Sequence, residues 1–161
     1  MKNRHQIKII SRTAAYIVRN LLCVALIFVS AAVHAQTESL TVISNEKGAP
    51  GQLKLSELKS ILKGERQRWR NGNKITIALM KTNTPAGSYT CKKIYDMSGD
   101  DLKKFWLALV FQGKADPPEF FSSVSEIESF VAENPGAIGV IDQQPISADT
   151  HIVLIDGKKT L

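Results

Sequence analysis

The sequence predicts an α/β domain with a mostly parallel sheet flanked by helices. Short apolar runs alternate with helical patterns along most of the chain. Two of these runs, residues 75–80 and 137–141, are almost continuously apolar, which is typical of strands covered on both faces. Because strands separated by helices need crossover connections, they favour parallel pairing.

The first part of the domain is predicted to contain a strand, a helix and a second strand. Residues 40–43 form the first short apolar run. A helix then begins at Leu55, carries apolar residues at helical spacing on its inward face, and ends at Gly64. After a loop with an Asn-Gly turn, residues 75–80 form the second strand.

Two helices are predicted to follow this strand. Thr84 is a typical N-cap residue with Pro85 at the first helical position, and this helix is expected to reach about Met97. The next helix begins after Ser98 with two acidic residues in its first turn, where the helix dipole favours them, and Gly113 ends it. Its buried face is expected to consist of Leu102, Phe105, Trp106, Leu109 and Val110.

The last part of the chain is predicted to contain a loop, a helix and two strands. Pro117-Pro118 predicts a loop without regular structure. Ser123 caps a helix that ends at Asn134-Pro135-Gly136. Residues 137–141 and 152–155 form the two final strands, joined by a polar loop.

Residues 1–35 have the pattern of a cleaved signal peptide. Five Lys and Arg residues occur there without any Asp or Glu, and residues 21–33 carry no charge. Cleavage after Val33-His34-Ala35 would leave Gln36 first. The alternative is a membrane anchor, which needs about 20 apolar residues and is therefore disfavoured. We expect a periplasmic domain of residues 36–161 with no membrane span after cleavage.

Cleavage would remove most of the net positive charge. The signal segment holds five of the 21 Lys and Arg residues and none of the 15 Asp and Glu residues, which leaves 16 basic against 15 acidic residues. This balance gives no support for nucleic-acid binding, which needs a clustered basic face on the folded part. The local excess at Arg66, Arg68 and Arg70 is interpreted as a solvated loop.

The sequence shows no pattern typical of a catalytic or metal centre, and we expect neither enzyme activity nor a cofactor. His151 is the single His that remains after cleavage, so no Ser/His or Cys/His arrangement is indicated. Cys91 is likewise the single remaining cysteine. We interpret it as a small buried hydrophobic residue, with a reactive thiol or a link to another chain as the alternatives.

Several motifs follow one another in a characteristic order. They are Leu58-x-x-Ile61-Leu62-x-Gly64, Trp69-x-x-Gly72, Trp106-x-x-x-x-Phe111-x-Gly113, Pro117-Pro118 and Asn134-Pro135-Gly136-Ala137-Ile138-Gly139-Val140. With these motifs the chain resembles the phosphate ABC transporter substrate-binding family, and most closely its short, single-lobe members. The resemblance covers about residues 40–155. It implies a single periplasmic-binding-protein-like (PBP-like) lobe, of the type 2 class.

The resemblance also implies a ligand site. Residues 81–88 follow a strand and open a helix, and they occupy the place of the family's Ser/Thr-rich phosphate loop. Ligands gather at the carboxyl ends of strands in open α/β sheets, where a helix N-terminus offers unpaired N–H groups. The alternative is that these are ordinary turn and cap residues. The candidate ligand-binding residues are Ser44 and Asn45, expected to face this loop from the first strand, together with Lys81, Thr82, Thr84, Gly87 and Ser88.

The chain departs from the family pattern at two arginine positions. Short members carry an Arg near the head of the second helix and another after the helix tryptophan, and these places fall at Gly87 and Ala108. Because a guanidinium forms two parallel hydrogen bonds with phosphate and Lys81 offers a point charge, we expect weak or partner-dependent binding of phosphate or a similar small oxyanion. The alternative function is an accessory subunit of an envelope complex, which binds a protein partner and no ligand.

Overall fold

The computed structural model describes residues 39–45 and 47–161. The predicted signal peptide, residues 1–35, lies outside this part of the chain, and its cleavage stays a prediction. Among the described residues, no helix is long and apolar enough to cross a membrane.

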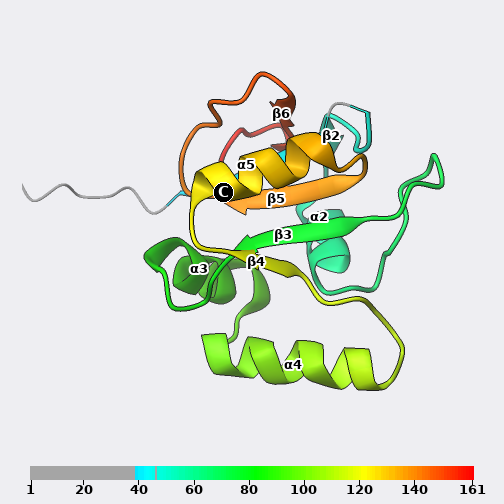
Figure 1. The fold of residues 1–161 in the computed structure, drawn as a ribbon, viewed down its shortest axis with the longest axis vertical. Helices are drawn as coiled ribbons and strands as arrows, with labels where there is room; N and C mark the ends of the chain where they lie inside the picture. Colours follow the sequence, from blue (N-terminus) through cyan, green and yellow to red (C-terminus); the bar gives the residue numbers. More distant parts are fainter. Residues whose placement is uncertain (1–38, 46) are drawn as a thin grey trace, which may run out of the picture. The chain divides into compact units, whose positions relative to one another are not determined.

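A five-stranded sheet forms the centre of the domain (Figure 1). In spatial order its strands are β4 (Glu119–Phe121), β3 (Thr76–Met80), β5 (Ala137–Ile141), β1 (Thr41–Asn45) and β6 (Thr150–Ile152). Strand β3 pairs in parallel with β4 and β5, whereas β1 is antiparallel to β5 and β6. Strand β1 therefore runs against the other four, and the predicted mostly parallel α/β sheet is confirmed.

A second, smaller sheet lies outside this central one. It consists of β2 (Gln52–Leu53) and β7 (Leu154–Ile155), which pair in parallel. Residues 150–155 therefore contribute to both sheets, with β6 in the large sheet and β7 in the small one. The single strand predicted for residues 152–155 is thus two short strands separated by Val153.

Helices cover both faces of the central sheet. They are α2 (Leu55–Leu62), α3 (Pro85–Thr90), the π-helix η1 (Cys91–Tyr95), α4 (Gly99–Phe111) and α5 (Val124–Glu133). One core joins alternate strand residues such as Leu79 to α2, η1 and α4. The other core joins the intervening residues, such as Met80, to α3 and α5. This alternation is the period-2 pattern of strands, and it explains why the central strands are apolar throughout.

The helix predicted to reach Met97 is shorter and changes type along its length. Regular α-helix ends at Thr90, and the π-helix η1 continues to Tyr95, after which Asp96 has a left-handed backbone with φ of 56°. The buried Tyr95 hydroxyl donates to the Leu62 carbonyl oxygen over 2.7 Å. This bond satisfies a carbonyl at the end of α2, where the helix itself offers no partner, and ties η1 to α2.

Two further predictions are corrected by the structure. Strand β4 begins directly after Pro117-Pro118, in a segment expected to have no regular structure, because pairing with β3 holds it extended. In α4, Leu102 and Trp106 are buried as predicted, whereas Val110 is 41% exposed. The inner face of α4 is therefore narrower than its apolar pattern suggests.

Candidate functional site

The predicted loop, residues 81–88, lies at the carboxyl ends of two parallel strands. It follows β3 directly and leads into α3. The backbone N–H of Lys81 donates to the Phe121 carbonyl oxygen over 2.9 Å, which continues the β3–β4 pairing into the loop. The loop thus occupies the edge of an α/β sheet at which ligands commonly bind.

The side chain of Lys81 is held across this edge by a residue from the neighbouring strand end. Its Nζ donates to Ser122 Oγ over 2.7 Å, and Ser122 follows β4 immediately. The backbone N–H of Ser122 donates to Glu126 Oε2 over 2.8 Å, which fixes the serine in place. Sequence reasoning missed Ser122 because β4 was not predicted. A polar residue that directly follows the apolar Phe120-Phe121 pair is the signal that could have identified it.

Thr84 and Gly87 hold the loop together from within. Thr84 Oγ1 donates to the Lys81 carbonyl oxygen over 2.8 Å and accepts from the Gly87 N–H over 3.0 Å. The Ser88 N–H donates to the Thr84 carbonyl oxygen over 2.9 Å. Two amides at the start of α3 are therefore already satisfied by the N-cap. Contact of Thr84 or Gly87 with an anion stays a prediction.

Gly87 allows α3 to lie directly against the loop. A Cβ at this position would lie 2.0 Å from the Lys81 carbonyl oxygen, far inside van der Waals contact. No side chain fits there, so the arginine expected near this position from the family pattern has no room. Ala108, the other position without the expected arginine, is exposed on α4.

The expectation that Ser44 and Asn45 face this loop is wrong. Because β1 is antiparallel to β5, the end of β1 lies beside the start of β5, opposite the edge where β3 ends. Both side chains are buried and bonded there. Ser44 Oγ donates to the Ala137 carbonyl oxygen over 3.1 Å, and Asn45 Nδ2 donates to the Ala132 carbonyl oxygen over 2.7 Å.

A small hollow of about 320 Å³ opens beside the loop. It is lined by Lys81, Thr82, Asn83, Lys103 and Phe120. Lys103 Nζ lies 3.1 Å from Asp100 Oδ1, so one of the two ammonium groups is already paired. Thr82 packs against the start of α4, where a Cβ on Gly99 would lie 2.8 Å from the Thr82 Cβ. The hollow therefore offers an anion the ammonium group of Lys81 and the polar groups of Thr82 and Asn83. The ammonium group of Lys103 is also present, but Asp100 partly neutralises its charge.

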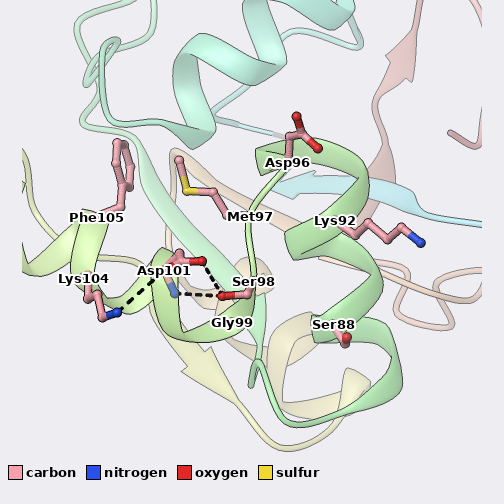
Figure 2. A pocket seen from close by; sticks show the side chains of 9 residues that line it. All are labelled: Ser88, Lys92, Asp96, Met97, Ser98, Gly99, Asp101, Lys104 and Phe105. Carbon is pink, nitrogen blue, oxygen red and sulfur yellow. Dashed lines mark hydrogen bonds and ion pairs between the residues drawn. The ribbon is translucent and has the colours of Figure 1, made fainter.

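Ser88 lines a different and larger hollow, of about 860 Å³, between η1 and the start of α4 (Figure 2). Two lysines and two aspartates line it, Lys92 and Lys104 against Asp96 and Asp101. A hydrogen bond from Ser98 lowers the pKa of Asp101, and Lys104 Nζ lies 3.7 Å from the same carboxylate. Because the charges balance, this hollow has no electrostatic preference for an anion. Ser88 and Lys81 thus line different hollows, and the structure does not bring them together at one site.

The described residues give no support for metal or thiol chemistry. No group of three or more His, Cys, Asp or Glu side chains among them could hold a metal ion. Cys91 is buried in η1, and desolvation raises the pKa of its thiol, so little reactive thiolate is present at neutral pH. The interpretation of Cys91 as a small buried residue agrees with this position.

The central sheet and its flanking helices form a single α/β lobe with a polar strand edge. Three solved structures share this fold. An ABC-type phosphate transport receptor from Vibrio cholerae superimposes with a TM-score of 0.60 at 15% identity, covering 76% of this chain and 48% of the receptor. PstS from Borrelia burgdorferi superimposes with a TM-score of 0.54 at 20% identity, covering 74% of this chain and 48% of PstS.

A third similar structure comes from Clostridium perfringens. It is described as a phosphate ABC transporter substrate-binding protein and contains bound phosphate; its TM-score is 0.55 at 18% identity, with 74% of this chain and 46% of that chain covered. The resemblance predicted from the sequence is therefore confirmed for the fold. This chain spans about half the length of the chains it matches. No protein-family model and no curated protein matches the sequence.

Proposed function

We propose that this chain is an exported PBP-like domain that binds phosphate or a similar small oxyanion weakly. The observation that carries the proposal is the position of Lys81, whose ammonium group is held by Ser122 at the carboxyl ends of β3 and β4. An incoming oxyanion would contact the ammonium group and the serine hydroxyl together. The phosphate bound in the similar structure from Clostridium perfringens supports this choice of ligand.

The number of donors limits the affinity. Micromolar binding needs about −8 kcal/mol, and a charge-assisted hydrogen bond contributes about 1.5–3 kcal/mol before the cost of association is subtracted. Lys81, Ser122 and the two polar loop residues Thr82 and Asn83 therefore support millimolar binding by this lobe alone. Tighter binding would need donors from a second protein or a second copy that covers the exposed edge.

Calorimetry and NMR titration of the mature protein with phosphate, sulfate and chloride test the proposal. We expect saturable binding of phosphate or sulfate in the millimolar range and much weaker binding of chloride, which carries a single charge and has no separate oxygens for Lys81, Ser122 and the loop residues. Titrations in which none of the three anions shifts the amide signals of residues 81–83 and 122 would contradict the proposal.

A specific observation favours a second function, that of an accessory subunit. Leu107, Val110 and Phe111 are 58%, 41% and 83% exposed and share the outer face of α4 at i, i+3 and i+4 spacing. Phe111 is the most exposed of these side chains. An apolar stripe in this position is typical of a surface that another protein covers.

Site-specific photocrosslinking distinguishes this second function from oxyanion binding. A photoreactive residue at Phe111 should give one defined crosslinked protein in native envelopes, and the same residue at Gln112, beside the stripe, should give much less. Lys81→Ala should leave this crosslink unchanged. Equal diffuse crosslinking from both positions would contradict a dedicated partner.

A further inference from the structure

A third cavity lies at the opposite end of β3 from Lys81. It has a volume of about 460 Å³ and is formed by the segment after β1, the start of α2 and the loop between α2 and β3. Its lining residues are Lys47, Gly48, Ala49, Pro50, Gln52, Leu53, Glu57, Arg66, Trp69, Arg70 and Asn71. In Figure 1 this loop extends from the side of the sheet away from α3. The cavity is therefore separate from the candidate oxyanion site.

One wall of the cavity is apolar and fixed in place. It includes Ala49, Pro50 and Leu53 together with Trp69, which is only 4% exposed. The indole Nε1 donates to the Gly136 carbonyl oxygen over 2.9 Å. Because this bond and the surrounding core hold the ring, a ligand would meet a preformed apolar surface.

The other wall is cationic. Lys47, Arg66 and Arg70 line it against the single carboxylate of Glu57. The Arg66 guanidinium lies 5.9 Å from the centre of the Trp69 ring, and its Nη1 lies 3.6 Å from Glu57 Oε1. Arg66 is thereby oriented by an aromatic face and a carboxylate at the same time. Its Nε also donates to the Arg68 carbonyl oxygen over 3.3 Å, so this guanidinium is largely engaged and mainly adds positive charge to the wall.

The three cationic side chains of this cavity outnumber its single carboxylate, Glu57, so a net positive charge remains. Glu57 already accepts a hydrogen bond from the Lys54 N–H over 3.0 Å, as part of the capping of α2. This bond, together with the nearby cations, lowers the pKa of Glu57. Within the described residues, the side chains of Lys47 and Arg70 form neither an ion pair nor a hydrogen bond. Two cationic groups beside a cavity are thus available to a ligand.

We propose that this cavity binds a small organic anion, with a carboxylate or phosphate head group on a compact apolar body. The head group pairs with Lys47 and Arg70, and the apolar body lies against Ala49 and Pro50, beside the edge of Trp69. Inorganic phosphate would leave the apolar wall and most of the volume unfilled. A neutral apolar molecule would leave the cations without a partner. The loop with three arginines, interpreted from the sequence as merely solvated, supplies two of the three lining cations.

NMR titration of the mature protein tests this inference, because the domain has two tryptophans in different environments. Trp69 lines the cavity, whereas Trp106 is in the core and serves as an internal reference. The probes are phenyl phosphate and phenylacetate, with inorganic phosphate and benzyl alcohol as controls. We expect one or both anionic aromatic probes to shift the Trp69 indole signal with saturation in the micromolar to millimolar range. Each control should bind at least fivefold more weakly at this signal.

Three variants assign the binding to the cavity. Arg70→Ala should weaken probe binding about fivefold or more, since it removes a charge-assisted contact. Arg68→Ala is the matched control, because Arg68 lies in the same loop and carries the same charge but does not line the cavity. Glu57→Gln should strengthen binding, since it removes the competing charge and keeps an oxygen that can accept from Lys54.

The outcomes are distinguishable from those at the Lys81 site, because Lys81→Ala should leave the Trp69 titration unchanged. Equal binding of benzyl alcohol and the anionic probes would overturn the proposal of an anion site. So would equal weakening by Arg70→Ala and Arg68→Ala, which would indicate general attraction to a basic loop. A Trp69 signal that no probe shifts up to about 10 mM would overturn it as well.

Discussion

Lys81 Nζ and Ser122 Oγ lie 2.7 Å apart and join the carboxyl ends of β3 and β4. The two residues are 41 positions apart in the sequence, and the parallel pairing of their strands brings them together. Both groups remain at the exposed edge of the sheet. This pair therefore forms the centre of the proposed oxyanion site.

Lys81→Ala should reduce phosphate binding at least tenfold, because the substitution removes the one ammonium group that the loop itself contributes. Ser122→Ala should reduce it less, by about threefold, since a neutral hydroxyl contributes less than a charged donor. Calorimetry measures both. Lys159→Ala is the matched control, because Lys159 is exposed near the C-terminus and lines none of the described hollows. Equal losses for Lys81 and Lys159 variants would show that only net charge matters.

Gly87→Ala should destabilise the domain by about 1–3 kcal/mol, the cost of inserting a methyl group into a closely packed site. The new Cβ would lie 2.0 Å from the Lys81 carbonyl oxygen, so α3 and the loop would have to separate. Gly51→Ala is the control, because a Cβ there meets nothing within 4 Å. Chemical denaturation of both variants gives the difference. An unchanged free energy of unfolding for Gly87→Ala would contradict the close approach of α3 to the loop.

The local sequence signals were sufficient for most of the fold. Gly64 and Gly113 end their helices with positive φ values of 75° and 63°, and Ser98 and Ser123 cap the next helices, as predicted. These features depend on neighbouring residues only. The alternation between two buried faces also explains why the central strands could be recognised from their apolar runs.

The errors concern relations between distant segments. Strand β4 exists because it pairs with β3, and its own three residues carry no clear strand pattern. Missing β4 also meant missing Ser122. The direction of β1 was not specified by any local signal, and the placement of Ser44 and Asn45 depended on that direction. The candidate loop could be predicted from adjacent residues in the sequence. Ser122, which holds Lys81, could not, because the two residues meet only through the pairing of β3 with β4.

Asn45→Ala should lower the free energy of unfolding by about 1–3 kcal/mol, the cost of leaving buried polar groups unsatisfied. Asn45 Nδ2 donates to the carbonyl oxygens of Val131 and Ala132 over 3.1 Å and 2.7 Å, near the end of α5. The variant should still bind phosphate as the wild type does, because Asn45 lies at the opposite sheet edge from Lys81. Denaturation and calorimetry together test this correction. A loss of phosphate binding without a loss of stability would restore Asn45 to the ligand site.

Cleavage of the predicted signal peptide should yield a mature protein that begins at Gln36. Intact-mass measurement of the protein recovered from the periplasm of an expressing cell checks this expectation. Replacing Ala35 with a charged residue, as in Ala35→Glu, should block processing, since signal peptidase needs a small residue there. Ala32→Glu, outside the positions read at the cleavage site, is a weaker perturbation and should permit more cleavage. A full-length chain in the wild type would favour the membrane-anchor alternative.

Asp101 makes the start of α4 sensitive to acid. The hydrogen bond from the Ser98 hydroxyl, 2.6 Å from Asp101 Oδ2, lowers the pKa of this carboxyl below its ordinary value of 3.8. A carboxyl whose pKa is lower in the folded than in the unfolded state stabilises the fold above the unfolded pKa. This contribution is lost as the pH falls through the folded pKa.

Ser98→Ala should therefore raise the pKa of Asp101 and flatten the pH dependence of stability below about pH 4. Carboxyl-carbon NMR titration measures the pKa, and denaturation between pH 2 and pH 7 measures the stability. Asp101→Asn should flatten the same part of the profile, because it removes the titrating group while an amide oxygen can still accept from Ser98. If Asp101 titrates alike in the wild type and Ser98→Ala, another group must hold the carboxylate, and the N-terminal turn of α4 is not stabilised by this pair.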